Sequence, residues 1–126
     1  MRAALALLIP ALFLAGCTAT GDSDPFAYAR KPLYTGGFEI AEIGEDGDSQ
    51  TFRVTDGSIA SVRMLVWVNA SAGGATVTIA DPAGSTMMTT SETAERSVPL
   101  NLGVWTVDLQ ARPESVGLVH ILVVRG

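Results

Sequence analysis

The chain has 126 residues, of which 48% are hydrophobic and 17% are charged, and its formal net charge is −5. This length is enough for one small domain, and the apolar content is too high for an intrinsically disordered protein. A single cysteine excludes an internal disulfide framework, and the acidic balance without clustered lysine or arginine argues against nucleic-acid binding.

The first sixteen residues differ in character from the rest of the chain. One positive charge, Arg2, precedes an apolar run over residues 3–13, which is shorter than the about 20 residues that a membrane-spanning helix needs. After this run comes Leu14-Ala15-Gly16-Cys17, in which small residues precede the only cysteine of the chain. The pattern predicts a signal peptide over residues 1–16, removed immediately before Cys17.

Leu14-Ala15-Gly16-Cys17 resembles the lipobox of bacterial lipoproteins. The resemblance implies lipidation at Cys17: diacylglycerol is attached to the thiol, the chain is cleaved before it, and the new amino terminus is acylated. Two or three acyl chains suffice for stable anchoring, so we expect a protein held at a membrane of the cell envelope without spanning it. The next residue is Thr18 and not aspartate, which by the same resemblance favours the outer membrane in a Gram-negative source. The alternatives are a free thiol in an uncleaved membrane segment and a chance cysteine near an ordinary cleavage site.

Lipidation would consume the only thiol of the chain. Thiol catalysis, redox sensing and cysteine-based metal binding would then all be excluded. Removal of residues 1–16 also takes away Arg2, so the mature side chains carry a formal charge of −6. We therefore expect the lipid, and not basic side chains, to bind the membrane.

Residues 17–32 are expected to form a flexible tether between the lipid and the domain. The segment is rich in Thr, Gly, Ser, Asp and Pro, and Phe26 and Tyr28 are its only large apolar side chains. Fully extended, some fifteen residues reach about 50 Å at about 3.3 Å each. Phe26 and Tyr28 either dock on the domain as an irregular arm, which we favour, or rest at the membrane interface.

Residues 33–126 follow a period of two with almost no helical signal. The clearest stretch, residues 105–111, alternates apolar with polar side chains, as a half-buried strand does. Residues 62–68 and 116–124 are apolar on both faces, which is typical of central strands covered on each side. Eight strands are predicted, at residues 37–43, 50–55, 59–69, 75–80, 85–90, 96–100, 104–111 and 117–125.

Turn signals separate these strands. Asp81-Pro82-Ala83-Gly84 suits a type I turn because proline presets φ at the second position. Turns recur about every 10 residues, which is the interval of sandwiches and barrels. The predicted fold class is all-β, with residues 33–126 forming a single small antiparallel β-sandwich.

The chain also carries a weaker resemblance, over residues 50–126. A strand ending in Val66-Trp67-Val68, the Asp81–Gly84 turn, a polar Thr/Ser stretch and then Leu102-Gly103-Val104-Trp105 resemble the bacterial pre-peptidase C-terminal and P-domain-like sandwiches. The resemblance implies a jelly-roll arrangement of the strands. It also implies a non-catalytic accessory module.

The only histidine, His120, lies in the last predicted strand, on the face of Leu118, Leu122 and Val124. A zinc site normally needs three or four ligands, and a hydrolytic triad needs a positioned nucleophile. None of the serines lies in a Gly-x-Ser-x-Gly elbow. We predict a structural histidine and no enzyme; a small hydrolase with a polar pocket at His120 is the second alternative to the binding function given below.

Glu45, Asp46 and Asp48 form the candidate metal site. Together with Gly47 they offer three carboxylates around a sharp turn, and calcium prefers six to eight oxygen ligands. The spacing matches no complete calcium loop, because the D-x-[DN]-x-[DN]-G pattern is absent. A solvated hairpin loop is the alternative, so calcium stays a candidate cofactor and no other is predicted.

Both tryptophans, Trp67 and Trp105, are predicted to lie in the core, since large apolar side chains on such strands are usually packed. This argues against a strong carbohydrate site, although Tyr28, Tyr34 and Phe38 could form one. The sequence thus predicts a lipid-anchored envelope lipoprotein whose sandwich binds a protein partner as an accessory module. Binding of carbohydrate or peptidoglycan is the first alternative.

Overall fold

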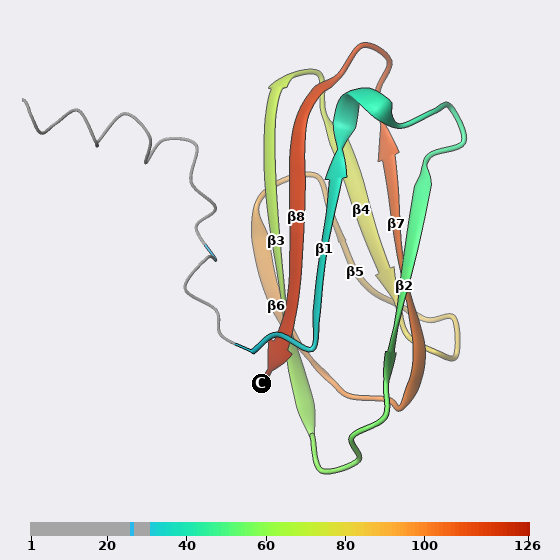
Figure 1. Ribbon diagram of the computed structural model, residues 1–126, viewed down its shortest axis with the longest axis vertical. Coiled ribbons are helices and arrows are strands. Elements are labelled where there is room, and N and C mark those ends of the chain that lie inside the picture. Colours follow the sequence, from blue (N-terminus) through green and yellow to red (C-terminus); the bar gives the residue numbers. More distant parts are fainter. Residues whose placement is uncertain (1–25, 27–30) are drawn as a thin grey trace, which may run out of the picture.

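The computed structural model describes Phe26 and residues 31–126. The predicted signal peptide, Cys17 and most of the predicted tether lie outside the described residues. Within the described part of the chain, eight strands form two four-stranded antiparallel sheets that pack face to face (Figure 1). No helix in this part is long and apolar enough to cross a membrane.

Sheet I has the strand order β1-β8-β3-β6, and sheet II has the order β2-β7-β4-β5. One short 3-10 turn, η1 (Ile40–Glu42), follows the first strand. The strands are β1 (Tyr34–Glu39), β2 (Asp48–Val54), β3 (Ser61–Ala72), β4 (Ala75–Ala80), β5 (Thr86–Thr90), β6 (Ala94–Pro99), β7 (Gly103–Ala111) and β8 (Val116–Arg125).

The strand order identifies the topology. The first strand lies beside the last in sheet I, the second lies beside the seventh in sheet II, and the chain crosses between the sheets as it proceeds. Eight strands connected in this way make two Greek keys, which is the jelly roll. The predicted all-β, jelly-roll-like sandwich of about eight strands is confirmed.

Sheet II is polar on its outer face because its strands alternate. In β4 and β7 every second side chain is buried and those between are half-buried or exposed. Apolar side chains at a spacing of two point to one face of a strand, so they meet the inner face of sheet I. The core between the sheets includes Met64, Val66, Val77, Ile79, Trp105, Val107, Leu109, Val119 and Ile121.

Sheet I has apolar side chains on both faces of its central strands. β3 lies between β8 and β6, and β8 lies between β1 and β3, so both central strands are flanked on both sides. In β3, Met64 and Val66 point into the core, whereas Leu65 points to the outer face and is also fully buried. The prediction that residues 62–68 and 116–124 form central strands is confirmed.

The first strand lies earlier than predicted. It pairs from Tyr34 to Glu39 with β8, and the chain then turns at Ile40–Glu42, where Ile43 N donates to Ile40 O over 3.2 Å. Gly36 and Gly37 suggest a weak strand by composition, yet an edge strand is held by its ladder to the neighbouring strand. Ile40 and Ile43 are spaced for a turn, and Ile40 enters the core from it.

The predicted turn at Asp81–Gly84 is present, and it fixes one end of sheet II. Asp81 is buried, and its Oδ1 accepts hydrogen bonds from Ala83 N over 3.0 Å and from Ser85 N over 2.9 Å. Its Oδ2 accepts a hydrogen bond from Asn101 Nδ2 over 2.9 Å. Asp81 therefore ties the β4–β5 turn to the loop between β6 and β7.

Candidate functional site

The outer face of sheet I carries a small apolar cluster separate from the core. Leu65, Leu122 and Val124 are buried there together with Phe26, which precedes the first strand. We call these four residues the outer cluster. Leu65 and Leu122 are direct neighbours in the β3–β8 register. The prediction that Phe26 docks on the domain is confirmed, while Tyr28 lies outside the described residues.

The outer cluster continues into a stretch of apolar side chains that the described residues leave open. Trp67 packs against the cluster and is half-buried, while Leu118 and Val116 of β8 are 50% and 49% exposed. We call Trp67, Leu118 and Val116 the open stripe. Single exposed apolar residues are common, but Leu118 and Val116 share a sheet face with a packed apolar cluster, which is the pattern of a contact surface.

His120 lies in the middle of this face. In the register of sheet I it stands between Gly37 of β1 and Trp67 of β3, and it is half-buried. Its face is the one predicted, shared with Leu118 and Leu122. Its register neighbours on the two adjacent strands are thus a glycine and a tryptophan.

The two tryptophans occupy different environments. Trp105 is 1% exposed in the core, and its Nε1 donates to Asn101 O over 2.8 Å. Trp67 does not lie in the core, so the prediction for this residue is wrong. Its side chain shares the outer face with Leu65, because successive side chains of a strand point to opposite faces and Met64 and Val66 face inward.

Tyr34 and Phe38 of the first strand both pack their rings against other side chains. Tyr34 stacks on Phe52 with ring centroids 4.5 Å apart, and its hydroxyl hydrogen-bonds Gln50 Oε1. Partial burial raises the pKa of the Tyr34 hydroxyl above its usual value. Phe38 is buried in the core. Of the candidate sugar platform of Tyr28, Tyr34 and Phe38, Phe38 is thus enclosed and Tyr34 is half-buried, while Tyr28 lies outside the described residues.

The candidate calcium residues lie in the exposed loop that leads into β2. Gly47 has φ +80°, and Gly47 N donates to Gly44 O over 2.9 Å, so the sharp turn is present. Asp48 Oδ1 accepts from Ser49 N over 2.8 Å, and Asp46 O accepts from Gln110 Nε2 over 3.2 Å. Among the described residues no group of three or more His, Cys, Asp or Glu is arranged to hold a metal ion.

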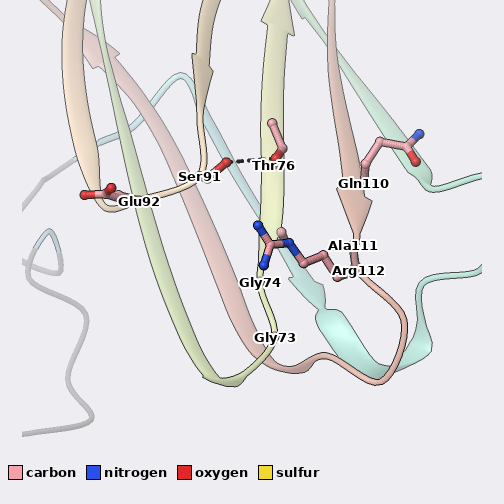
Figure 2. A pocket seen from close by; sticks show the side chains of 9 residues that line it. Gly73, Gly74, Thr76, Ser91, Glu92, Gln110, Ala111 and Arg112 are labelled. Atoms are coloured by element: carbon pink, nitrogen blue, oxygen red, sulfur yellow. Dashed lines mark hydrogen bonds between the residues drawn. The ribbon is translucent and has the colours of Figure 1, made fainter.

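A polar depression of about 360 Å³ lies near the β3–β4 connection (Figure 2). On one side Thr76 and Ser91 share a hydrogen bond of 2.8 Å between their hydroxyls. On the other, the Arg112 side chain lies beside Gly74, whose carbonyl accepts the Arg112 backbone N–H over 2.9 Å. Ser91 is thus paired with another hydroxyl, and the depression offers hydroxyl and guanidinium groups for hydrogen bonding to a ligand.

A second depression, of about 440 Å³, lies at the same end of the sandwich. It is lined by Ile40 and Ile43 around η1, by Glu45 of the acidic loop, and by the β7–β8 loop from Arg112 to Val116. Arg112 therefore borders both depressions. The second depression is more apolar in its lining, and it ends at Val116 of the open stripe.

Sequence reasoning did not identify the outer cluster or the open stripe as a site. The signal was present in residues 116–124, because a strand that is apolar on both faces needs a cover on each. One cover is sheet II, and on the other face Phe26 is the cover that the described residues supply, over Leu65, Leu122 and Val124. Leu118 and Val116 lie outside this cluster and are about half exposed.

Comparison with known proteins gives no family. No protein-family model and no curated protein matches the chain. Among solved structures, the SPBc2 prophage-derived protein YomS aligns with a TM-score of 0.37 and 12% identity, over 75% of this chain and 96% of its own. A structure of infectious bursal disease virus strain Gt aligns with a TM-score of 0.31 and 12% identity, over 76% of this chain and 30% of its own. Similarity this low carries no argument about function.

Proposed function

We propose that the protein is a lipid-anchored lipoprotein of the cell envelope whose jelly-roll domain is a non-catalytic accessory module that binds a protein partner. The anchor rests on Leu14-Ala15-Gly16-Cys17, with the only cysteine of the chain at the modified position. Thr18, in place of aspartate, supports the outer membrane as its location in a Gram-negative source.

The open stripe is the observation that supports the binding role. Leu118 and Val116 are each about half exposed on a central strand, on the same sheet face as the buried outer cluster, against which Trp67 packs. Covering an aliphatic side chain of this size contributes about 1.5–3 kcal/mol at full burial. An aromatic residue beside aliphatic ones on a rigid sheet is the composition that protein interfaces use at their centre.

A small hydrolase has no specific observation in its favour in the described part of the chain. Ser91 pairs with Thr76, and the register neighbours of His120 are Gly37 and Trp67. Carbohydrate or peptidoglycan binding has one supporting observation, the polar depression beside Arg112. The half-buried Trp67 would suit either ligand, whereas the exposed Leu118 and Val116 on the same face favour a protein surface, so protein binding is the better supported of the two.

The anchor is tested by the Cys17→Ser variant. We expect the variant to accumulate as an unprocessed precursor that incorporates no labelled fatty acid, because the thiol that receives diacylglycerol is absent. The measurement is metabolic labelling followed by gel mobility. Continued labelling of Cys17→Ser would refute the lipobox assignment.

The binding module is tested by a matched pair of leucine variants. Leu118 lies in the open stripe and Leu102 lies in the loop before β7, and the two are 50% and 54% exposed. After crosslinking in the native envelope, we expect wild type and Leu102→Asp to retain one stoichiometric protein partner that Leu118→Asp loses. Equal capture by both variants would place the partner elsewhere, and capture of polysaccharide alone would favour the carbohydrate alternative.

The same pull-down decides whether calcium belongs to the site. It is run with calcium and again with chelator, on wild type and on Asp46→Asn. Loss of the partner with chelator, and in the variant, is the result expected if Glu45, Asp46 and Asp48 bind the ion. Equal recovery in all four samples would make the acidic loop a solvated hairpin.

A further inference from the structure

Phe26 fixes the chain to the domain at a point well before the first strand. It is 9% exposed, and its neighbours in the outer cluster are Leu65, Leu122 and Val124 of the two central strands of sheet I. The contact is therefore on the outer face of sheet I, eight residues ahead of Tyr34, where β1 begins. The chain meets the domain at the middle strands of a sheet and not at its edge.

We propose that this contact orients the domain on the membrane, with the outer face of sheet I held towards the bilayer. The inference rests on the lipid anchor at Cys17 in the proposed function. Phe26 is nine positions after Cys17 in the sequence, and nine residue steps reach at most about 30 Å. Without the Phe26 contact, the seventeen residues from Cys17 to Tyr34 would reach about 55 Å.

The size of the sandwich shows how this difference in reach restricts the orientation of the domain on the membrane. Two sheets lie about 10 Å apart, so with outward side chains the domain is about 20 Å thick, and four strands at about 4.8 Å make it about 10 Å from centre to edge. A path from Phe26 around the edge to the opposite face is therefore about 30 Å. The chain from Cys17 to Phe26 could span this path only when fully extended, at high entropic cost. The chain from Cys17 to Tyr34, without the Phe26 contact, could span it easily.

The orientation also indicates where the protein partner would be located. The open stripe shares the face with the outer cluster, because Trp67 and Leu118 belong to the same side of β3 and β8 as Leu65 and Leu122. A partner that covers the open stripe would then be a protein presented at the membrane surface, and not one that approaches from the far side of the domain.

Two labelling positions on opposite faces test the orientation. Leu118 is on the outer face of sheet I and Val104 is on the outer face of sheet II, where it is 37% exposed. Acylation of Cys17 leaves no other thiol, so Leu118→Cys and Val104→Cys each provide one site for a donor dye. Both lipoproteins are reconstituted in phosphatidylethanolamine and phosphatidylglycerol vesicles that contain a headgroup-labelled acceptor lipid.

We expect energy transfer from position 118 to exceed that from position 104 by about twofold or more, because the two differ in height by about the domain's 20 Å thickness. Phe26→Ser should bring the two efficiencies to near equality, and Phe26→Leu should keep the difference. Equal transfer in the otherwise unaltered chain, or a difference that survives Phe26→Ser, would overturn the proposal. If neither labelled protein floats with the vesicles, the lipid anchor itself is wrong, and the proposal falls with it.

A second measurement tests the Phe26 contact without a membrane. Trp105 is 1% exposed, so acrylamide quenching of the folded protein reports mainly on Trp67, which packs against the outer cluster. We expect Phe26→Ser to increase the quenching constant and Phe26→Leu to leave it near that of wild type. An unchanged constant in Phe26→Ser would show that the contact does not persist in solution and would overturn the proposal, even where the lipid anchor holds.

Discussion

The outer faces of the two sheets differ, although the strands come from one short chain. Sheet II turns Thr76, Thr78 and Asp108 outward, all half-buried, and needs no cover. Sheet I turns Leu65 and Leu122 outward, and both are buried under Phe26 in the outer cluster. A polar sheet face can be exposed to solvent, whereas an apolar face is stable when another segment of the chain or another molecule packs over it.

The difference separates what stabilises the domain from what is available for binding. Side chains between the sheets are fully enclosed, so truncating one lowers the free energy of unfolding both by the lost burial and by the cavity that is left behind. Among the described residues, Phe26 covers Leu65, Leu122 and Val124 on the outer face of sheet I, whereas Leu118 and Val116 are about half exposed. Stability should therefore fall steeply for changes between the sheets, less steeply for changes under Phe26 or at the half-buried Trp67, and least at Leu118 and Val116.

The two tryptophans give the largest expected contrast. We expect Trp105→Ala to lower the free energy of unfolding by about 3–5 kcal/mol, because it removes a fully buried ring and the stacking on Phe52 at 6.0 Å. Trp67→Ala should cost about 1–2 kcal/mol, since its ring is half-buried and water fills the space. Urea denaturation followed by far-ultraviolet circular dichroism measures both. Equal losses would mean that the outer face is as enclosed as the core.

Two leucines on the same face sharpen the comparison, since they differ only in their cover. Leu65 is fully buried in the outer cluster and Leu118 is 50% exposed in the open stripe. We expect Leu65→Ala to lower the free energy of unfolding by about 2–4 kcal/mol and Leu118→Ala by about 0.5 kcal/mol or less. The loss in Leu65→Ala should shrink in a Phe26→Ser background, because the two side chains are in one cluster. If the losses of Leu65→Ala and Phe26→Ser simply add in the double variant, Phe26 does not pack over Leu65.

The polar turn of sheet II gives the next largest effect. Asp81→Ala leaves Ala83 N, Ser85 N and Asn101 Nδ2 without their acceptor, so we expect a loss of about 1–3 kcal/mol in the free energy of unfolding. Asp108→Ala, on the outer face of the same sheet, is the control and should stay within about 0.5 kcal/mol. Similar values for the two aspartates would mean that the turn is not held by these bonds.

The strands could be predicted from the sequence because the period of two is a local signal. β4 has the bounds predicted for it, Ala75–Ala80, where β-branched residues alternate between two turns. β1 was placed too late, because Gly36 and Gly37 carry no local strand signal and their pairing depends on β8, about 80 residues away. Distant pairing of this kind is invisible to a pattern read along one segment.

The candidate site could be predicted only in part, for a related reason. Alternation along the strand correctly predicts that Trp67 shares a face with Leu65, but the prediction that it lies in the core is wrong. Alternation shows which side chains share a face of the strand and does not show which face packs against the other sheet. When both faces of a strand are apolar, the choice is set by where the second sheet packs. Likewise, Glu45, Asp46 and Asp48 are close in sequence, yet the turn at Gly47 does not gather them into a metal cluster within the described residues.

The smallest effect concerns a polar contact that joins the two sheets. Asp56 follows β2 of sheet II, and its Oδ1 accepts from Ser58 Oγ over 2.6 Å and from Ser58 N over 2.9 Å. Its Oδ2 lies 2.9 Å from Arg125 Nη2 at the end of β8 in sheet I. These contacts, those of Ser58 first, favour the ionised carboxylate and lower the pKa of Asp56 from 3.8 to about 2.

Because the folded-state pKa lies below the unfolded one, the stabilisation is present above about pH 4 and is lost as the pH falls towards 2. We expect Asp56→Asn to be less stable than wild type at pH 5 and the two stability curves to converge by about pH 2, measured by urea denaturation at low salt. Ser58→Ala should reduce the pH dependence more than Arg125→Gln, since the exposed ion pair is screened by water and salt. Parallel curves for wild type and Asp56→Asn would show that this link between the sheets adds no pH-dependent stability.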